Sequence, residues 1–256
     1  MKTAVNWIFF LSVIVVNALA NILPINGYNT GQVSGFYPNY FVPAGFTFSI
    51  WGIIYLLLLT YTIAFTYYTI HADKFPKVQQ YLNQVNPLFL LTCVLNISWI
   101  FAWHYLQVVL SVIIMLFFLG ALCKIFIVVN KSVEEITPMQ GFLLTTPFTV
   151  YLGWISVATI ANFTALLVHV SWNGFGMHPI YWSSLMILIA IALGLYFLFK
   201  YSAFAFTLVI TWALWGIKAS QGKEELVNRF SSVGILILFA AMLFFILRQL
   251  KKRAAR

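Results

Sequence analysis

Few side chains in this sequence have the types and spacing that acid–base or metal chemistry requires. All five acidic residues fall in stretches expected to be loops: Asp73, Glu134, Glu135, Glu224 and Glu225. No histidine has another histidine, a cysteine or a carboxylate at ligand spacing, and no nucleophile or metalloprotease motif occurs. The sequence therefore predicts no catalytic residue, no metal site and no enzymatic activity.

Aromatic and amide side chains, in contrast, follow a regular pattern. Spacings of three, four, seven or eight residues place them on one face of each of three helices. The three stripes are Phe48, Trp51 and Tyr55; Asn96, Trp99 and Trp103; and Tyr151, Trp154 and Asn162. Ordinary helix packing could explain them, but Trp51, Trp99 and Trp154 lie several residues inside apolar stretches, away from the interfacial aromatic belts. An aromatic-lined cavity for a flat, mostly apolar ligand is the functional interpretation.

The elements that carry these stripes are membrane-spanning helices. Hydrophobic residues make up 62% of the chain and charged residues 7%, with a mean hydropathy of +0.96. That composition predicts an all-α polytopic membrane protein. Eight spans are expected, at about residues 4–23, 46–70, 87–105, 108–129, 140–169, 181–199, 202–218 and 230–248.

The distribution of basic residues predicts the orientation. With eight spans, eleven lysines and arginines lie on the side of the two termini, and Lys218, Lys223 and Arg229 lie on the other. Both termini should therefore be cytoplasmic, in the cell (plasma or inner) membrane. The net charge of +9 reflects this topology and a basic tail beside anionic lipid, so no nucleic-acid partner is expected.

The first apolar stretch has two interpretations. Lys2, the apolar run and the small residues "ALA" at 18–20 are typical of a signal peptide, whose cleavage would leave seven helices. The apolar run continues through Ile22 and Leu23, and the charge count fits eight spans. We therefore expect the first helix to be retained.

Three segments resemble the TspO/MBR family, also called translocator proteins or tryptophan-rich sensory proteins. They are "YPNYFVPAGFTFSIWGIIY" in the second span, "LNISWIFAWHY" in the third and "TTPFTVYLGWISVATIANF" in the fifth. The resemblance covers the first five spans and leaves the last three unassigned. The chain departs from the family pattern in its loop, where Tyr40 replaces a tryptophan and Pro43 is followed by Ala44.

The resemblance implies a five-helix TspO-like bundle over residues 1–175. Residues 176–256, which it does not cover, are expected to form a three-helix extension with a basic cytoplasmic tail. The resemblance also implies that the loop before the second span covers a cavity. That cavity would bind a tetrapyrrole such as haem or protoporphyrin, or a sterol, without a covalent cofactor. The role would be sensory, regulatory or in transport.

Other readings stay open at this point. The same helices could transport a neutral metabolite, or form a structural assembly factor that has no small-molecule ligand. Membrane lipid and a hydrophobic small molecule are the expected partners, and a homodimer is compatible with the sequence. The last three helices are expected on the flank of the bundle, without contributing to the main pocket.

Overall fold

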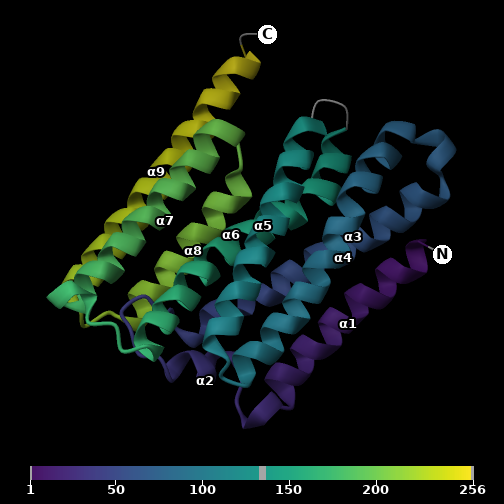
Figure 1. The fold of residues 1–256 in the computed structure, drawn as a ribbon. Coiled ribbons are helices and arrows are strands. Elements are labelled where there is room, and N and C mark those ends of the chain that lie inside the picture. The colour runs from purple at the N-terminus through teal and green to yellow at the C-terminus, as the bar shows by residue number, and fades with distance from the viewer. Residues whose placement is uncertain (1, 133–136, 255–256) are drawn as a thin grey trace.

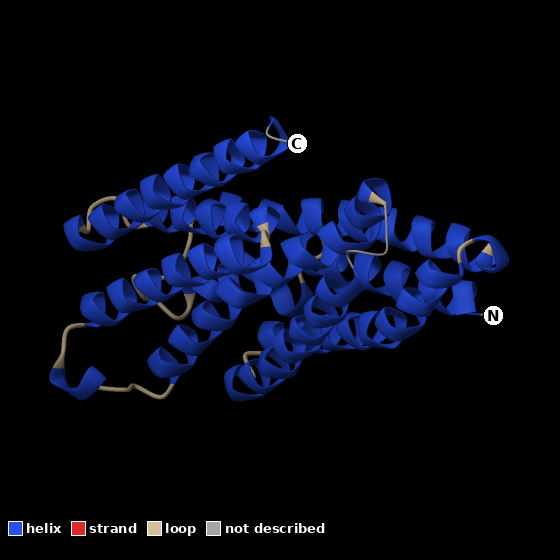
Figure 2. Cartoon of the chain, turned by 90° about the horizontal axis from the view of Figure 1, so that it is seen from above, coloured by secondary structure: helices blue, strands red, loops and turns tan. Residues whose placement is uncertain are grey.

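A computed structural model describes residues 2–132 and 137–254 of the chain, and these residues form helices joined by short loops, with no strand among them (Figures 1 and 2). The long helices are α1 (Lys2–Ile22), α3 (Ile50–Ile70), α4 (Pro76–His104), α5 (Val108–Ser132), α6 (Pro138–His169), α7 (Pro179–Tyr201), α8 (Phe204–Ser220) and α9 (Glu225–Ala254). The short elements are η1 (Ile25–Gly27), α2 (Thr30–Gly35), η2 (Gly45–Ser49), η3 (Ala72–Lys74) and η5 (Gly174–Gly176).

The long helices have the length and composition of membrane spans. Among the described residues, seven helices are long and apolar enough to cross a bilayer. The eighth, α8, is also apolar but has only 17 residues. At 1.5 Å per residue α8 is about 26 Å long, close to the ~30 Å thickness of a hydrocarbon core. The all-α polytopic membrane fold predicted from the sequence is confirmed.

The third span differs most from its predicted bounds of 87–105. Helix α4 begins at Pro76, and Pro87 lies inside it. Pro76 occupies the first turn, where the missing N–H of proline costs no intrahelical hydrogen bond. The polar residues before Pro87 therefore extend the helix beyond its apolar part, which a hydropathy window cannot detect.

Successive long helices run in opposite directions, so both described ends of the chain lie at the same end of the bundle (Figure 1). The long segment that joins α1 to α3 lies at the other end and contains α2. Helices α7, α8 and α9 lie together beside α6 (Figure 1). Which end faces the cytoplasm stays a prediction.

Helix α8 makes the most extensive contact between the last three helices and the rest. A Cβ atom at Gly153 of α6 would lie 3.0 Å from Cβ of Val209 and 3.3 Å from the carbonyl oxygen of Phe206, both on α8. Only glycine permits so close an approach of the two helices. The buried apolar core is continuous from α1 to α9. The division of the chain at residue 175 stays a prediction.

Candidate functional site

One aromatic pocket lies near the end of the bundle that carries the α1–α3 segment. It is formed by α3, α4 and α6 together with α2, η2 and the loop between them. Its lining residues are Thr30, Ser34, Pro43, Phe48, Trp51, Trp99, Trp103, Trp154, Val157, Ala158, Ala161 and Asn162. Six of the nine residues predicted from the stripes are among them.

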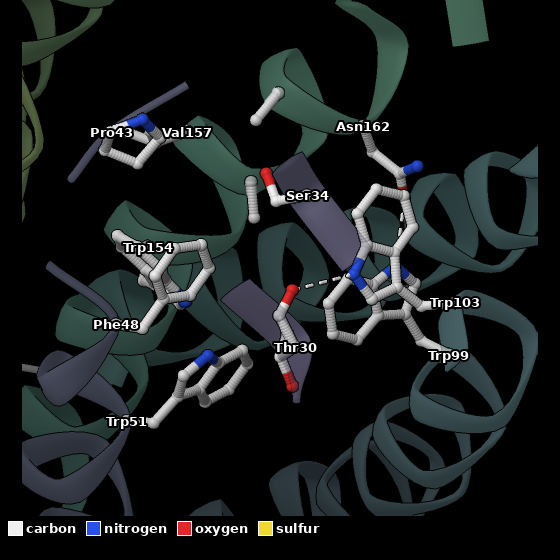
Figure 3. Close-up of a pocket in the computed structure, with 12 residues that line it drawn as sticks. Thr30, Ser34, Pro43, Phe48, Trp51, Trp99, Trp103, Trp154, Val157 and Asn162 are labelled. Atoms are coloured by element: carbon white, nitrogen blue, oxygen red, sulfur yellow. Dashed lines mark hydrogen bonds between the residues drawn. The ribbon is translucent and has the colours of Figure 1, made fainter. Parts of the chain in front are cut away.

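The aromatic rings form two facing walls (Figure 3). On one side, the Trp51 ring lies edge to face with that of Trp154 at a centroid distance of 6.2 Å, and Phe48 meets Trp154 in the same way at 6.0 Å. On the other side, Trp99 and Trp103 stack at 5.8 Å with an interplanar angle of 14°. Both rings of this second wall come from α4. Their spacing of four residues places them on the same face of that helix.

Three of the predicted residues, Tyr55, Asn96 and Tyr151, support the pocket from behind. The Tyr55 ring stacks under Trp51 at 5.6 Å, away from the lining. The side chain of Asn96 accepts a hydrogen bond of 2.7 Å from Asn17 of α1 and donates one of 2.9 Å to the Tyr151 hydroxyl. These amide and phenol groups tie α1, α4 and α6 together. The pattern predicted that these three residues would line the pocket, but they are not among its lining residues.

Asn162 does line the pocket, but its amide is already paired. Its oxygen accepts a hydrogen bond of 2.9 Å from the Trp99 indole, and its nitrogen donates one of 2.9 Å to the Ser111 hydroxyl. Asn162 therefore fixes the orientation of the Trp99 ring. Sequence reasoning missed Ser111 and Asn17, since single polar residues in apolar helices reveal no partner.

Of the indole N–H groups in the lining, those of Trp99 and Trp103 are hydrogen-bonded, and that of Trp154 is buried without a partner in the described part of the chain. The side chain is buried, with 3% of its surface exposed, and its Nε1 atom has no hydrogen-bond partner among the described residues. A buried donor without a partner carries a cost of about 1–3 kcal/mol. A ligand with an acceptor on its edge could remove that cost.

The α1–α3 segment covers the pocket, and we call its residues 24–44 the lid. Helix α2 begins with a capping box, in which Asn29 accepts a hydrogen bond from the Gln32 backbone and Gln32 accepts one from the Asn29 backbone. This motif stabilises so short a helix by satisfying its first N–H groups. The spacing of "NTGQ" at residues 29–32 was available in the sequence, but no helix was predicted there.

The lid is held on the end of α4 by His104, which is fully buried. Its Nδ1 atom lies 3.1 Å from the carbonyl oxygen of Ile25, and its Nε2 atom lies 3.1 Å from the Thr30 hydroxyl. Because a carbonyl can only accept, neutral His104 donates from Nδ1 and accepts at Nε2. The Trp103 indole also donates a hydrogen bond of 3.2 Å to the Thr30 carbonyl oxygen. The Asn26 side chain donates one of 3.0 Å to the backbone carbonyl oxygen of His104.

A further lid residue, Tyr37, packs against the same end of α4. Its ring centroid lies 5.8 Å from that of Trp103. Burial raises the pKa of the Tyr37 phenol above its ordinary value, so this side chain stays neutral. A tight turn joins α4 to α5, and the buried side chains of Trp103 and His104 pack inward just before it.

Helix α8 lines no part of the pocket but holds one of its edges in place. The Trp212 indole donates a hydrogen bond of 3.0 Å to the carbonyl oxygen of Thr47, and the Ala44 backbone N–H donates one of 2.9 Å to that of Gly216. A Cβ atom at Gly216 would collide with the Thr47 side chain. The position of Phe48 therefore depends on a helix from the extension, a dependence that the sequence did not predict.

The pocket is small as it stands, with a volume of about 40 Å³. That space holds only a few water molecules, whereas sites for drug-sized ligands commonly measure about 300–1,000 Å³. A larger hollow of about 490 Å³ lies elsewhere, as an open groove between α8 and α9 that is lined in part by Trp212 and Trp215. The aromatic pocket is therefore much the smaller of the two hollows.

The long apolar helices define an integral, multi-pass membrane protein. The chain belongs to the TSPO-like protein family, whose family model matches residues 3–247. This match extends through α7, α8 and most of α9, so the family pattern includes the three helices that the sequence motifs had left unassigned. No curated protein and no solved structure matches the chain.

Proposed function

We propose that the aromatic pocket binds a flat, largely apolar ligand and that binding serves a sensory, regulatory or transport role. A tetrapyrrole such as haem or protoporphyrin is the leading ligand class, and a sterol is the second. The observation that carries the proposal is the pair of facing aromatic walls, one of which contains the buried, unpartnered indole N–H of Trp154. Ring faces suit a planar ligand, and this donor suits a polar group on its edge.

The chemistry of the lining favours binding over catalysis. Its polar side chains, apart from the indoles, are Thr30, Ser34 and Asn162, and no histidine, cysteine or carboxylate is included. General acid–base catalysis needs a group that titrates near neutral pH, and covalent catalysis needs an activated nucleophile. Ligand capture is therefore the activity that these side chains support.

Ligand entry requires the lid to move. A volume of about 40 Å³ cannot contain a tetrapyrrole, so the ligand must displace residues that now close the pocket. The lid is the part that can do so, because it is joined to α4 chiefly through Thr30, Asn26 and His104. On this proposal, the narrow pocket belongs to the ligand-free state of a two-state site.

The direct experiment is titration of the detergent-purified protein with protoporphyrin IX, haem and a sterol, followed by tryptophan quenching. Saturable quenching by a tetrapyrrole is expected. Ala161→Phe, which places a ring in the pocket, should abolish it. Leu188→Phe is the matched control, because Leu188 lies on α7, outside the lining and 44% exposed.

Two results would remove the proposal. One is saturable quenching by none of the three compounds, which would favour a structural role without a ligand. The other is equal quenching of Ala161→Phe and wild-type protein, both folded and monodisperse, which would place the ligand elsewhere.

We also propose that both termini face the cytoplasm across the cell membrane. The support is the excess of basic residues at the end of the bundle that carries the termini. A cysteine introduced at Tyr28, an exposed lid residue, should react with an impermeant maleimide added to intact cells. Reaction only after permeabilisation would reverse the topology.

A further inference from the structure

The open groove between α8 and α9 is separate from the aromatic pocket. Leu208, Trp212, Trp215 and Lys218 of α8 line one side, and Ile235 and Phe239 of α9 line the other. The groove has a volume of about 490 Å³. Trp215 is 54% exposed and Phe239 53% exposed, so apolar surface in the groove is left uncovered by protein.

The groove runs along most of α8. Leu208 and Lys218 are ten residues apart on α8, which corresponds to about 15 Å along the helix axis. Lys218 lies in the last turn of α8, so its ammonium group is placed near the headgroups of one leaflet, while Trp212 is at the midpoint of the helix.

The walls of the groove are already ordered. The Trp212 indole is fixed by its 3.0 Å hydrogen bond to the Thr47 carbonyl. Trp212 and Trp215 meet edge to face at 5.4 Å, and the Phe46 ring packs against the two at 5.5 and 5.7 Å. A preformed wall binds a ligand such as an acyl chain with less loss of side-chain freedom than a mobile surface does.

Lys218 has a charge that the described part of the protein does not neutralise. Among the described residues, Arg229 forms an ion pair with Glu225 at 2.7 Å, and no carboxylate lies within 4.0 Å of the Lys218 ammonium. The turn from α8 into α9 also carries Lys223 and Glu224. Three basic residues against two acidic ones leave this end of the groove positive, which complements a negatively charged headgroup.

We propose that the α8–α9 groove binds one anionic phospholipid from the leaflet on the side of the α8–α9 turn. An acyl chain would occupy the space between Trp212, Trp215 and Phe239, and the phosphate would contact Nζ of Lys218. The site depends on none of the residues that line the aromatic pocket. It therefore stands or falls independently of the proposed tetrapyrrole binding.

The test is native mass spectrometry of the full chain released from detergent after incubation with equal amounts of phosphatidylglycerol and phosphatidylcholine. Wild-type protein should retain phosphatidylglycerol preferentially. Lys218→Gln should lower that preference about fivefold, the effect expected for one lysine at an anionic surface. Lys223→Gln is the matched control, since it removes the same charge from the same turn but lies outside the groove.

A second pair of variants tests the apolar part of the groove. Ile235→Trp should fill it and reduce retention of both lipids, whereas Val233→Trp, on an exposed position of α9 outside the lining, should not. An unchanged lipid preference in Lys218→Gln would overturn the proposal. An equal loss in Lys223→Gln would do the same, as would a lipid-free dimer that Ile235→Trp dissociates.

Discussion

The aromatic pocket and the α8–α9 groove are both rich in tryptophan, yet they differ in almost every physical respect. The pocket is about 40 Å³ and its Trp154 is 3% exposed, whereas the groove is about 490 Å³ and its Trp215 is 54% exposed. Rings from α3, α4 and α6 surround the pocket, whereas those of the groove come from α8 and α9 alone. Tryptophan content alone therefore does not identify a ligand site, because enclosure by several helices also matters.

The Trp212 side chain contacts both regions. Trp212 is part of the groove wall, and its indole also holds the Thr47 carbonyl, one residue before Phe48 of the pocket. Substitution of Trp212 would therefore disturb both regions, so it is a poor control for either. The variants below are chosen to affect only one region, or to affect the contact between them.

The largest expected effect is on stability, from Tyr151→Ala. Tyr151 is among the largest fully buried side chains, and its hydroxyl accepts the hydrogen bond of Asn96. Loss of a buried ring costs about 3–5 kcal/mol, and Asn96 would also lose a partner. Heating in detergent, followed by size-exclusion chromatography, should show aggregation at a clearly lower temperature than for wild-type protein.

Trp215→Ala is the comparison for that experiment, since its ring lies on the exposed surface of α8. It should leave the aggregation temperature nearly unchanged. Equal destabilisation by Tyr151→Ala and Trp215→Ala would mean that the buried ring contributes no more to stability than the exposed one.

The next effect concerns the contact between the two regions, through Gly216→Ala. The added methyl group would collide with the Thr47 side chain, so η2 and Phe48 would have to shift. Overpacking of this kind costs about 1–3 kcal/mol. Both the aggregation temperature and the affinity for a pocket ligand should fall.

Gly120→Ala is the matched control for Gly216→Ala, because a Cβ atom at Gly120 of α5 meets nothing within 4 Å. It should be neutral or slightly stabilising, since alanine favours helix. If Gly216→Ala behaved like Gly120→Ala, the pocket edge would not depend on α8.

The smallest effect is expected from Thr30→Val, which removes the hydroxyl that faces His104 and keeps the side-chain shape. One hydrogen bond contributes about 0.5–1.5 kcal/mol. The closed lid should be weakened by that amount, and stopped-flow quenching should show a several-fold faster association of ligand. Thr30→Ser keeps the hydroxyl and should bind ligand at the wild-type rate. If Thr30→Val also bound ligand at the wild-type rate, opening of the lid would not limit ligand entry.

Much of the fold and part of the site could be predicted from the sequence. Long apolar stretches define spans, because a bilayer requires about 20 apolar residues, and α-helical periodicity placed Trp51, Trp99 and Trp154 on inward faces. What failed was the assignment of polar partners. Periodicity shows that Asn96 points inward, but only the packing of α1 against α4 shows that Asn17 meets it.

The contacts that hold the lid were also beyond the sequence. The family resemblance implied a cover over the cavity, but the contacts of His104 with Ile25 and Thr30 join residues that are 79 and 74 positions apart. No local pattern reports such distances. The support of Phe48 by α8 depends in the same way on a helix more than 150 residues away in the chain, as Trp212 and Thr47 show.

The central claim is that Trp51 and Trp154 contact a planar ligand, and the affinity of folded variants for protoporphyrin IX tests it most directly. Loss of one ring from a stacking site costs about 1–3 kcal/mol, so Trp51→Phe and Trp154→Phe should each weaken binding roughly ten- to hundredfold. Trp7→Phe is the control, since Trp7 lies near the far end of α1 and its indole binds Thr66. Wild-type affinity in both pocket variants, with Trp7→Phe also unchanged, would contradict the account.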